Sequence, residues 1–166
     1  MEEAPLLAEI PPLRRYARAL VGDRAAADDL VQDTLERAWS RRRSWQDDRP
    51  LRPWLFSIMH NLRLDQLRRP GIAPQPLDER IPEPGTRPTQ SDALELADLA
   101  AALYRLPEEQ RAVILLVALE DMSYDAIAQT LAIPRGTVMS RLFRGREHLR
   151  RLMAPESGVT HLRVVP

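Results

Sequence analysis

Six prolines and two glycines crowd one stretch near the middle of the chain, between Pro70 and Gln90. Proline lacks a backbone N–H and its ring clashes with the preceding turn of a helix, so neither a helix nor a central strand can persist there. The sequence therefore predicts a linker over 70–90. It separates an N-terminal block of about 70 residues from a C-terminal block of about 75, and blocks of this size need well-made helical cores.

Helix signals fill the N-terminal block. Asp23 can cap a helix over 24–43 that carries one apolar stripe, and two further helices are expected over 13–21 and 51–69. Trp39 and Trp54 flank apolar stripes and are expected in the core.

The C-terminal block shows the same type of pattern. A helix is expected from Ser91 or Asp92 to Tyr104, and Pro107 suits the first position of the next one. Ser123 can cap a short helix, which a tight turn at 132–134 separates from a last, arginine-rich helix. Alternating β-branched strands with hairpin turns appear nowhere, so the predicted fold class is all-α, with two small helical domains joined by a Pro-rich linker.

Charge is balanced overall but unevenly distributed along the chain. There are 24 basic and 24 acidic residues, and every basic residue is arginine. The segment 78–121 holds ten acids against four arginines, whereas 134–151 holds six arginines against the single acid Glu147. A basic end behind an acidic middle indicates a local site for a polyanion, because the field of the whole chain is neutral.

Several classes of function lack their sequence signals. The chain has no cysteine, no apolar run near the roughly 20 residues of a membrane span, and no phosphate-binding or nucleophile-elbow motif. His60, His148 and His161 show no metal-ligand spacing. We therefore expect a cytoplasmic protein without membrane insertion, with no metal, no cofactor and no catalytic residues, and not an enzyme.

The last two predicted helices form a helix-turn-helix unit, whose second helix can enter the major groove of DNA. A helical wheel divides that second helix into two faces. The core face carries Val138, Leu142, Gly145, Leu149 and Leu152. The opposite face and its flanks carry Ser140, Phe143, Arg144, Arg151, Met139 and Arg141. The pattern favours DNA binding, while a solvated helix with arginines near its C-terminus, or a surface for membranes or acidic partners, stays open.

Two longer stretches resemble the extracytoplasmic-function (ECF) sigma factors, the promoter-specificity subunits of bacterial RNA polymerase. Residues 106–152, which include LPEEQRAVILL and GTVMSRLFRGREHLRRL, resemble region 4 of this family. DDLVQDTLERAW and RPWLFSIMHNLRLDQLRR resemble region 2. Both motifs stand in the order found in the family, with a linker between them.

The resemblance implies three sets of functional residues. The helix with DLVQDT would dock on core RNA polymerase through Asp29, Gln32, Asp33, Glu36 and Arg37. The −10 promoter element, melted by holding a flipped base and the single strand, would contact Trp45, Asn61, Arg63, Arg68 and Arg69. The −35 element would contact Arg135, Thr137, Met139, Ser140, Phe143, Arg144 and Arg146. Many relatives have a basic residue where this chain has Met139, which puts one contact in doubt and indicates a different promoter sequence.

The resemblance also implies domain limits and partners. Residues 1–69 would form sigma region 2, 70–90 the linker, 91–153 sigma region 4 and 154–166 a C-terminal tail. The partners would be core RNA polymerase, promoter DNA and an anti-sigma factor that wraps both domains. Two other hypotheses remain: a sigma mimic that binds a sequestering regulator without touching a promoter, and a stand-alone helix-turn-helix regulator, which would need a dimer interface.

Overall fold

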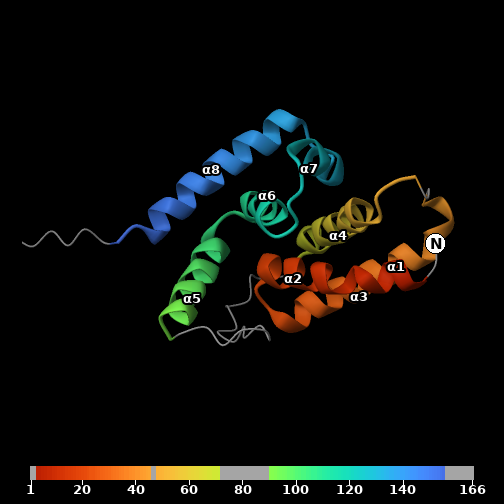
Figure 1. The fold of residues 1–166 in the computed structure, drawn as a ribbon, viewed down its shortest axis with the longest axis horizontal. Helices are drawn as coiled ribbons and strands as arrows, with labels where there is room; N and C mark the ends of the chain where they lie inside the picture. Colours follow the sequence, from red (N-terminus) through yellow and green to blue (C-terminus); the bar gives the residue numbers. More distant parts are fainter. Residues whose placement is uncertain (1–2, 46–47, 72–89, 156–166) are drawn as a thin grey trace, which may run out of the picture.

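The computed structural model describes residues 3–45, 48–71 and 90–155, and all regular structure in these ranges is helical. Figure 1 shows a bundle of the first helices on one side and the later helices on the other. The elements in order are α1 (Glu3–Ala8), α2 (Ile10–Val21), α3 (Arg24–Ser40), the short 3-10 helix η1 (Arg42–Ser44), α4 (Leu51–Arg68), α5 (Gln90–Arg105), α6 (Glu108–Ala118), α7 (Tyr124–Leu131) and α8 (Arg135–Met153).

The first unit is a bundle of α2, α3 and α4, with α1 against its end. The cap predicted at Asp23 is confirmed, because its carboxylate accepts a hydrogen bond from the Ala26 amide at 2.8 Å. The expectation that Trp39 is a core residue is wrong: 37% of its surface is exposed. It lies in the last turn of α3, beside α1, and α1 itself was not predicted from the sequence.

The second unit is built around α6, which contacts α5, α7 and α8. Ser123 caps α7 by accepting from the Ala126 amide at 3.1 Å, as predicted. The turn into α8 contains Ala132 in a left-handed conformation, with φ 53°. Gly145 permits the close approach of α8 to α6, because a side-chain carbon there would lie 2.8 Å from Cδ1 of Ile114.

The two units pack against each other and share one hydrophobic core. α2 contacts α5 and α6, and α4 contacts α7. Gly22 ends α2 with φ +81°, and a side-chain carbon there would lie 2.5 Å from Cε2 of Tyr104, so glycine is required by both the turn and the contact. Residues 72–89 of the expected linker and 156–166 of the expected tail lie outside the described residues.

Candidate nucleic-acid interface

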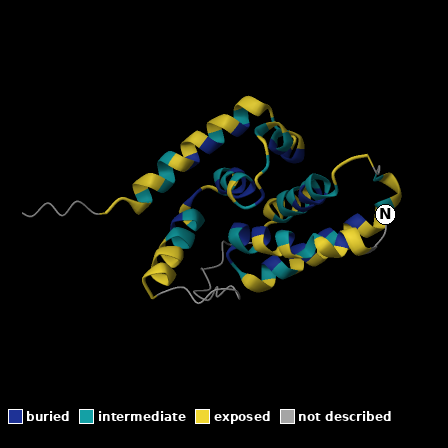
Figure 2. Cartoon of the chain, in the orientation of Figure 1, coloured by how far each residue is buried: buried dark blue, intermediate teal, exposed yellow. Residues whose placement is uncertain are grey.

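The outer face of α8 is open to solvent along its length (Figure 2). Val138, Leu142 and Gly145 are buried, which confirms the predicted core face. On the opposite side, Phe143 is 69% and Met139 is 47% exposed. The other exposed members of the predicted −35 set are Arg135, Ser140, Arg144 and Arg146, while Thr137 is half-buried. Large apolar side chains rarely lie so open without a partner, and arginines beside them suit DNA phosphates and bases.

The first turn of α8 is already partly paired. Arg135 lies 3.0 Å from Asp125 and its guanidinium is 6.0 Å from the centre of the Tyr124 ring, both on α7. The pair is exposed, so it is worth little and can yield to a phosphate. Farther along, no ion pair involves Arg144 or Arg146 within the described parts of the chain.

The −10 set on α4 is divided by the structure. Asn61, Arg68 and Arg69 are exposed, and Arg68 makes only a loose contact of 3.8 Å with Asp65. Arg63 instead makes a two-pronged pair with Glu108 of α6, with its Nε 2.6 Å from Oε1 and its Nη2 3.0 Å from Oε2. The structure therefore leaves three of these four side chains free for DNA and engages the fourth.

Trp45, the candidate in the loop before α4, is half-buried. Its ring centre lies 6.4 Å from that of Trp54, and its indole N–H is buried with no acceptor among the described residues. A buried indole N–H without a partner is uncommon. Residues 46 and 47 of the same loop lie outside the described residues.

The predicted polymerase-docking residues share the outward side of α3. Asp29, Gln32, Asp33, Glu36 and Arg37 are all exposed. Gln32 donates to Glu36 at 3.0 Å. A polar pocket of about 430 Å³ joins this face to α4, and it is lined by Asp33, Glu36, Arg37, Ser40, Leu62 and Arg69. Members of two predicted sets, for polymerase and for the −10 element, thus meet in one hollow.

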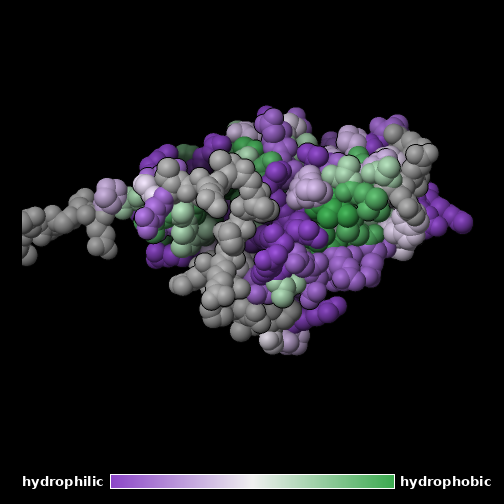
Figure 3. Space-filling view, turned by 60° about the horizontal axis from the view of Figure 1, so that its bottom comes forward, coloured by the Kyte–Doolittle hydropathy of each residue, from purple (hydrophilic) through white to green (hydrophobic). Residues whose placement is uncertain are grey.

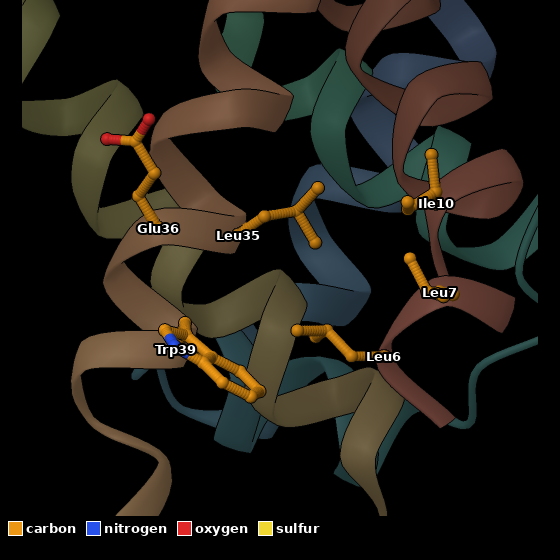
Figure 4. A pocket seen from close by; sticks show the side chains of 6 residues that line it. All are labelled: Leu6, Leu7, Ile10, Leu35, Glu36 and Trp39. Carbon is orange, nitrogen blue, oxygen red and sulfur yellow. The ribbon is translucent and has the colours of Figure 1, made fainter. Parts of the chain in front are cut away.

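An apolar pocket that the sequence did not predict lies between α1, α2 and α3. Figure 3 shows a large hydrophobic patch on this face of the molecule. The pocket has a volume of about 330 Å³ and is lined by Leu6, Leu7, Ile10, Leu35, Glu36 and Trp39. In Figure 4 the leucines and Ile10 gather around the hollow, whereas the carboxylate of Glu36 points away from it. Because α1 forms one wall, a reading that misses α1 also misses the pocket.

Three charged residues between the units were also missed as functional candidates. Arg111 is 5% exposed and donates to the carbonyl oxygens of Leu20 and Tyr104, both at 2.9 Å. Burial lowers the pKa of Arg111, and the charge of Glu108 opposes this change. Glu120 has no exposed side-chain surface and pairs with Arg15 at 3.0 Å. Only the contact between two units could have revealed these roles.

His60 lies on α4 at the same junction. Burial lowers its pKa below the usual 6.5, the charge of Arg141 on α8 lowers it further, and Glu108 acts in the opposite direction. No group of three or more acidic or histidine side chains could hold a metal ion in the ranges that the structure describes. In the same ranges, no helix is both long and apolar enough to cross a membrane.

Comparison with known families agrees with this geometry. Residues 6–60 match the model of the sigma2 domain of PhyR, and residues 96–149 match that of sigma-70 region 4. The chain is 36% identical over 149 residues to the ECF RNA polymerase sigma factor EcfG of Rhodopseudomonas palustris, covering 89% of this chain and 82% of the relative. The chain belongs to the ECF RNA polymerase sigma factors. Relatives of this sigma factor are thus transcription factors rather than enzymes.

Other comparisons set the limits of the likeness. The sigma factor is 41% identical over 154 residues to SigE of Mycolicibacterium smegmatis; the match covers 88% of this chain but 59% of that relative. A solved structure of the sigma factor RpoE with the anti-sigma factor NepR, from Bartonella quintana, superposes with a TM-score of 0.75 at 32% identity, covering 93% of this chain and 97% of that one. The anti-anti-sigma factor PhyR, also with NepR, shares the fold at 16% identity, with a TM-score of 0.63, over 92% of this chain and 50% of that one.

Proposed function

We propose that this sigma factor docks on core RNA polymerase through the exposed side of α3 and directs initiation at promoters with −10 and −35 elements. In this proposal α8 binds the −35 element, and α4 with the loop before it holds the opened −10 strand. Residues 1–69 act as region 2, 91–153 as region 4, and 70–90 as the linker between them, with 154–166 as a tail.

The outer face of α8 is the observation that carries the proposal. Its core side is buried on α6, so the second helix of the helix-turn-helix is fixed in orientation. The opposite side combines exposed Phe143 and Met139 with unpaired Arg144, which suits thymine methyl groups and guanine edges in a major groove. A merely solvated helix would not need two large exposed apolar side chains between its arginines.

The proposal includes where and with what the protein acts. It needs no catalytic group of its own, because opening the duplex consumes no nucleotide and the polymerase performs the chemistry. It acts in the cytoplasm, where core polymerase and promoter DNA are found. An anti-sigma factor is the proposed regulator, since RpoE, which covers nearly the same length, was solved with the anti-sigma factor NepR.

Two single substitutions test the division of labour. Arg144→Ala should reduce transcription from promoters with a −35 element roughly tenfold, because a two-pronged contact to a base is lost, and should leave core polymerase binding intact. Asp33→Ala should weaken binding to core polymerase and leave DNA binding by region 4 unchanged. Arg150→Ala is the matched control, since Arg150 lies in the last turn of α8 and pairs with Glu147. Equal loss of both activities in Arg144→Ala would reject the proposal.

The sigma mimic is the second candidate, favoured by the match of residues 6–60 to the sigma2 domain of PhyR. A mimic binds the regulator without binding core polymerase or a promoter. Pull-down of core polymerase by the purified wild-type protein separates the two: retention that Gln32→Ala or Asp33→Ala removes supports the sigma factor. Binding to an anti-sigma factor without any retention of polymerase would support the mimic.

A further inference from the structure

We propose that Glu108 competes with promoter DNA for Arg63, so that the packed arrangement of the two units masks part of the −10 surface. The proposal rests on the function proposed above, in which Arg63 contacts the −10 strand. It assigns to Glu108 the part of an internal substitute for a phosphate group.

The contact between Arg63 and Glu108 has the form of an arginine–phosphate contact. Two guanidinium nitrogens face two carboxylate oxygens at 2.6 and 3.0 Å, and a third nitrogen donates to Gln66 at 3.2 Å. The side chains of Arg63 and Glu108 are only 15% and 21% exposed, so salt screens the pair less than a surface pair. A planar guanidinium that binds a carboxylate in this way has no free fork for a DNA phosphate.

Glu108 is held in place before it meets Arg63. It is the first residue of α6, where the positive end of the helix stabilises an anion. Nη2 of buried Arg111 lies 3.9 Å from the second carboxylate oxygen. Glu108 therefore lies between two arginines, of which only Arg63 belongs to the first unit.

A second ion cluster closes the same interface elsewhere. The carboxylate of Glu120, from the second unit, is fully buried and lies 3.0 Å from Arg15 and 3.7 Å from Arg52. Arg52 also pairs with Glu9 at 2.7 Å. These arginines lie on α2 and α4, so the contact of the units is fixed at two separate points.

The polymerase-docking face is not part of this interface, because its five residues on α3 remain exposed. Core polymerase can therefore meet region 2 while the units are packed, but Arg63 reaches the −10 strand only after Glu108 has released it. The ion pair thus separates polymerase docking from promoter contact.

The experiment compares Glu108→Gln with Glu109→Gln. Glu109 is the neighbouring acid, but it is exposed and pairs within its own unit, with Arg141 at 3.6 Å. The described residues contain no cysteine and the sequence has none, so Ala25→Cys and Gln129→Cys, at exposed positions of α3 and α7, can carry a donor and an acceptor dye. Affinity is measured with a labelled single-stranded oligonucleotide of random sequence, in all variants of the full chain.

We expect Glu108→Gln to bind the oligonucleotide roughly fivefold more tightly, with lower energy transfer between the dyes, since a charge-assisted pair is lost. Glu109→Gln should leave both unchanged, and the gain should vanish when Glu108→Gln is combined with Arg63→Gln. Unchanged affinity and energy transfer in Glu108→Gln, while Arg63→Gln alone weakens binding, would overturn the inference and leave the −10 role of Arg63 intact. If Arg63→Gln has no effect even beside Glu108→Gln, the −10 role itself fails.

If Glu108→Gln unfolds part of the chain, Glu120→Gln gives an independent route to the same state. Its partners Arg15 and Arg52 are partly exposed and can be hydrated once released. Opening by this variant should also raise affinity for the oligonucleotide. Opening without any gain in affinity would show that Glu108 does not compete with DNA.

Discussion

The helices α4 and α8 carry the two predicted DNA surfaces, yet the protein treats them differently. On α8 the apolar and cationic outer residues face solvent, and Phe143 is 69% exposed. On α4 the central arginine, Arg63, is bound by Glu108 from the other unit. One surface is ready for DNA as the chain folds, and the other is complete only when the units separate. Identical residue types can therefore differ in availability because of a contact made far along the chain.

Breaking the junction at Arg111 should have the largest effect. Arg111→Ala should lower the free energy of unfolding by about 3 kcal/mol, because several buried carbonyl oxygens lose their donor. These are the carbonyls of Leu20, Leu103, Tyr104 and Leu106. Urea unfolding measures the change. Arg105→Ala, at an exposed position on α5, is the control and should change the value by less than about 0.5 kcal/mol; an equal, small loss in both variants would show that Arg111 does not join the units.

The two helix caps test whether the units unfold together. Asp23→Ala and Ser123→Ala each remove one capping hydrogen bond, in the first and in the second unit, and each should cost about 1 kcal/mol. Since the units share a core, both variants should shift one common thermal transition. Two transitions, each moved by only one of the substitutions, would mean that the units are independent and would weaken the contrast between α4 and α8.

Acidification sharpens the contrast at the junction through His60. A histidine whose pKa is lowered on folding binds fewer protons than in the unfolded chain, so its stability contribution is complete above about pH 6.5 and is lost as the pH falls below that value. His60→Gln should flatten the decline in unfolding free energy between about pH 7 and 5. Arg141→Gln should flatten it partly, because burial is the larger cause. A decline that is identical in all three proteins would contradict this account.

The smallest effect is expected on the open helix. Met139→Arg adds a cation to the outer face of α8 and should raise affinity for duplex DNA about threefold, with a salt dependence steeper by about one counterion. Met153→Arg is a close control, because Met139 and Met153 are 47% and 45% exposed but Met153 lies in the last turn. Equal gains in both would indicate general attraction to DNA rather than a defined recognition face.

Local patterns were sufficient for the fold and for α8. The caps at Asp23 and Ser123 and the buried side of α8 follow from residues within one or two turns of each other, and the structure confirms them. The pair of Arg63 and Glu108 joins residues 45 positions apart, so no periodicity within one helix could reveal it. The exposure of Trp39 was missed for a similar reason, since it depends on α1, whose short sequence gives a weak helix signal.

Mapping of transcript 5′ ends tests the central claim most directly. The purified protein is added to bacterial core RNA polymerase on sheared genomic DNA from its own source, with Arg144→Ala in parallel. We predict 5′ ends that depend on the protein, share two upstream elements at a fixed spacing, and are weakened by Arg144→Ala. If the folded protein, free of inhibitor, produces no such ends, it does not direct initiation, and the account of α8 as a promoter-reading helix is contradicted.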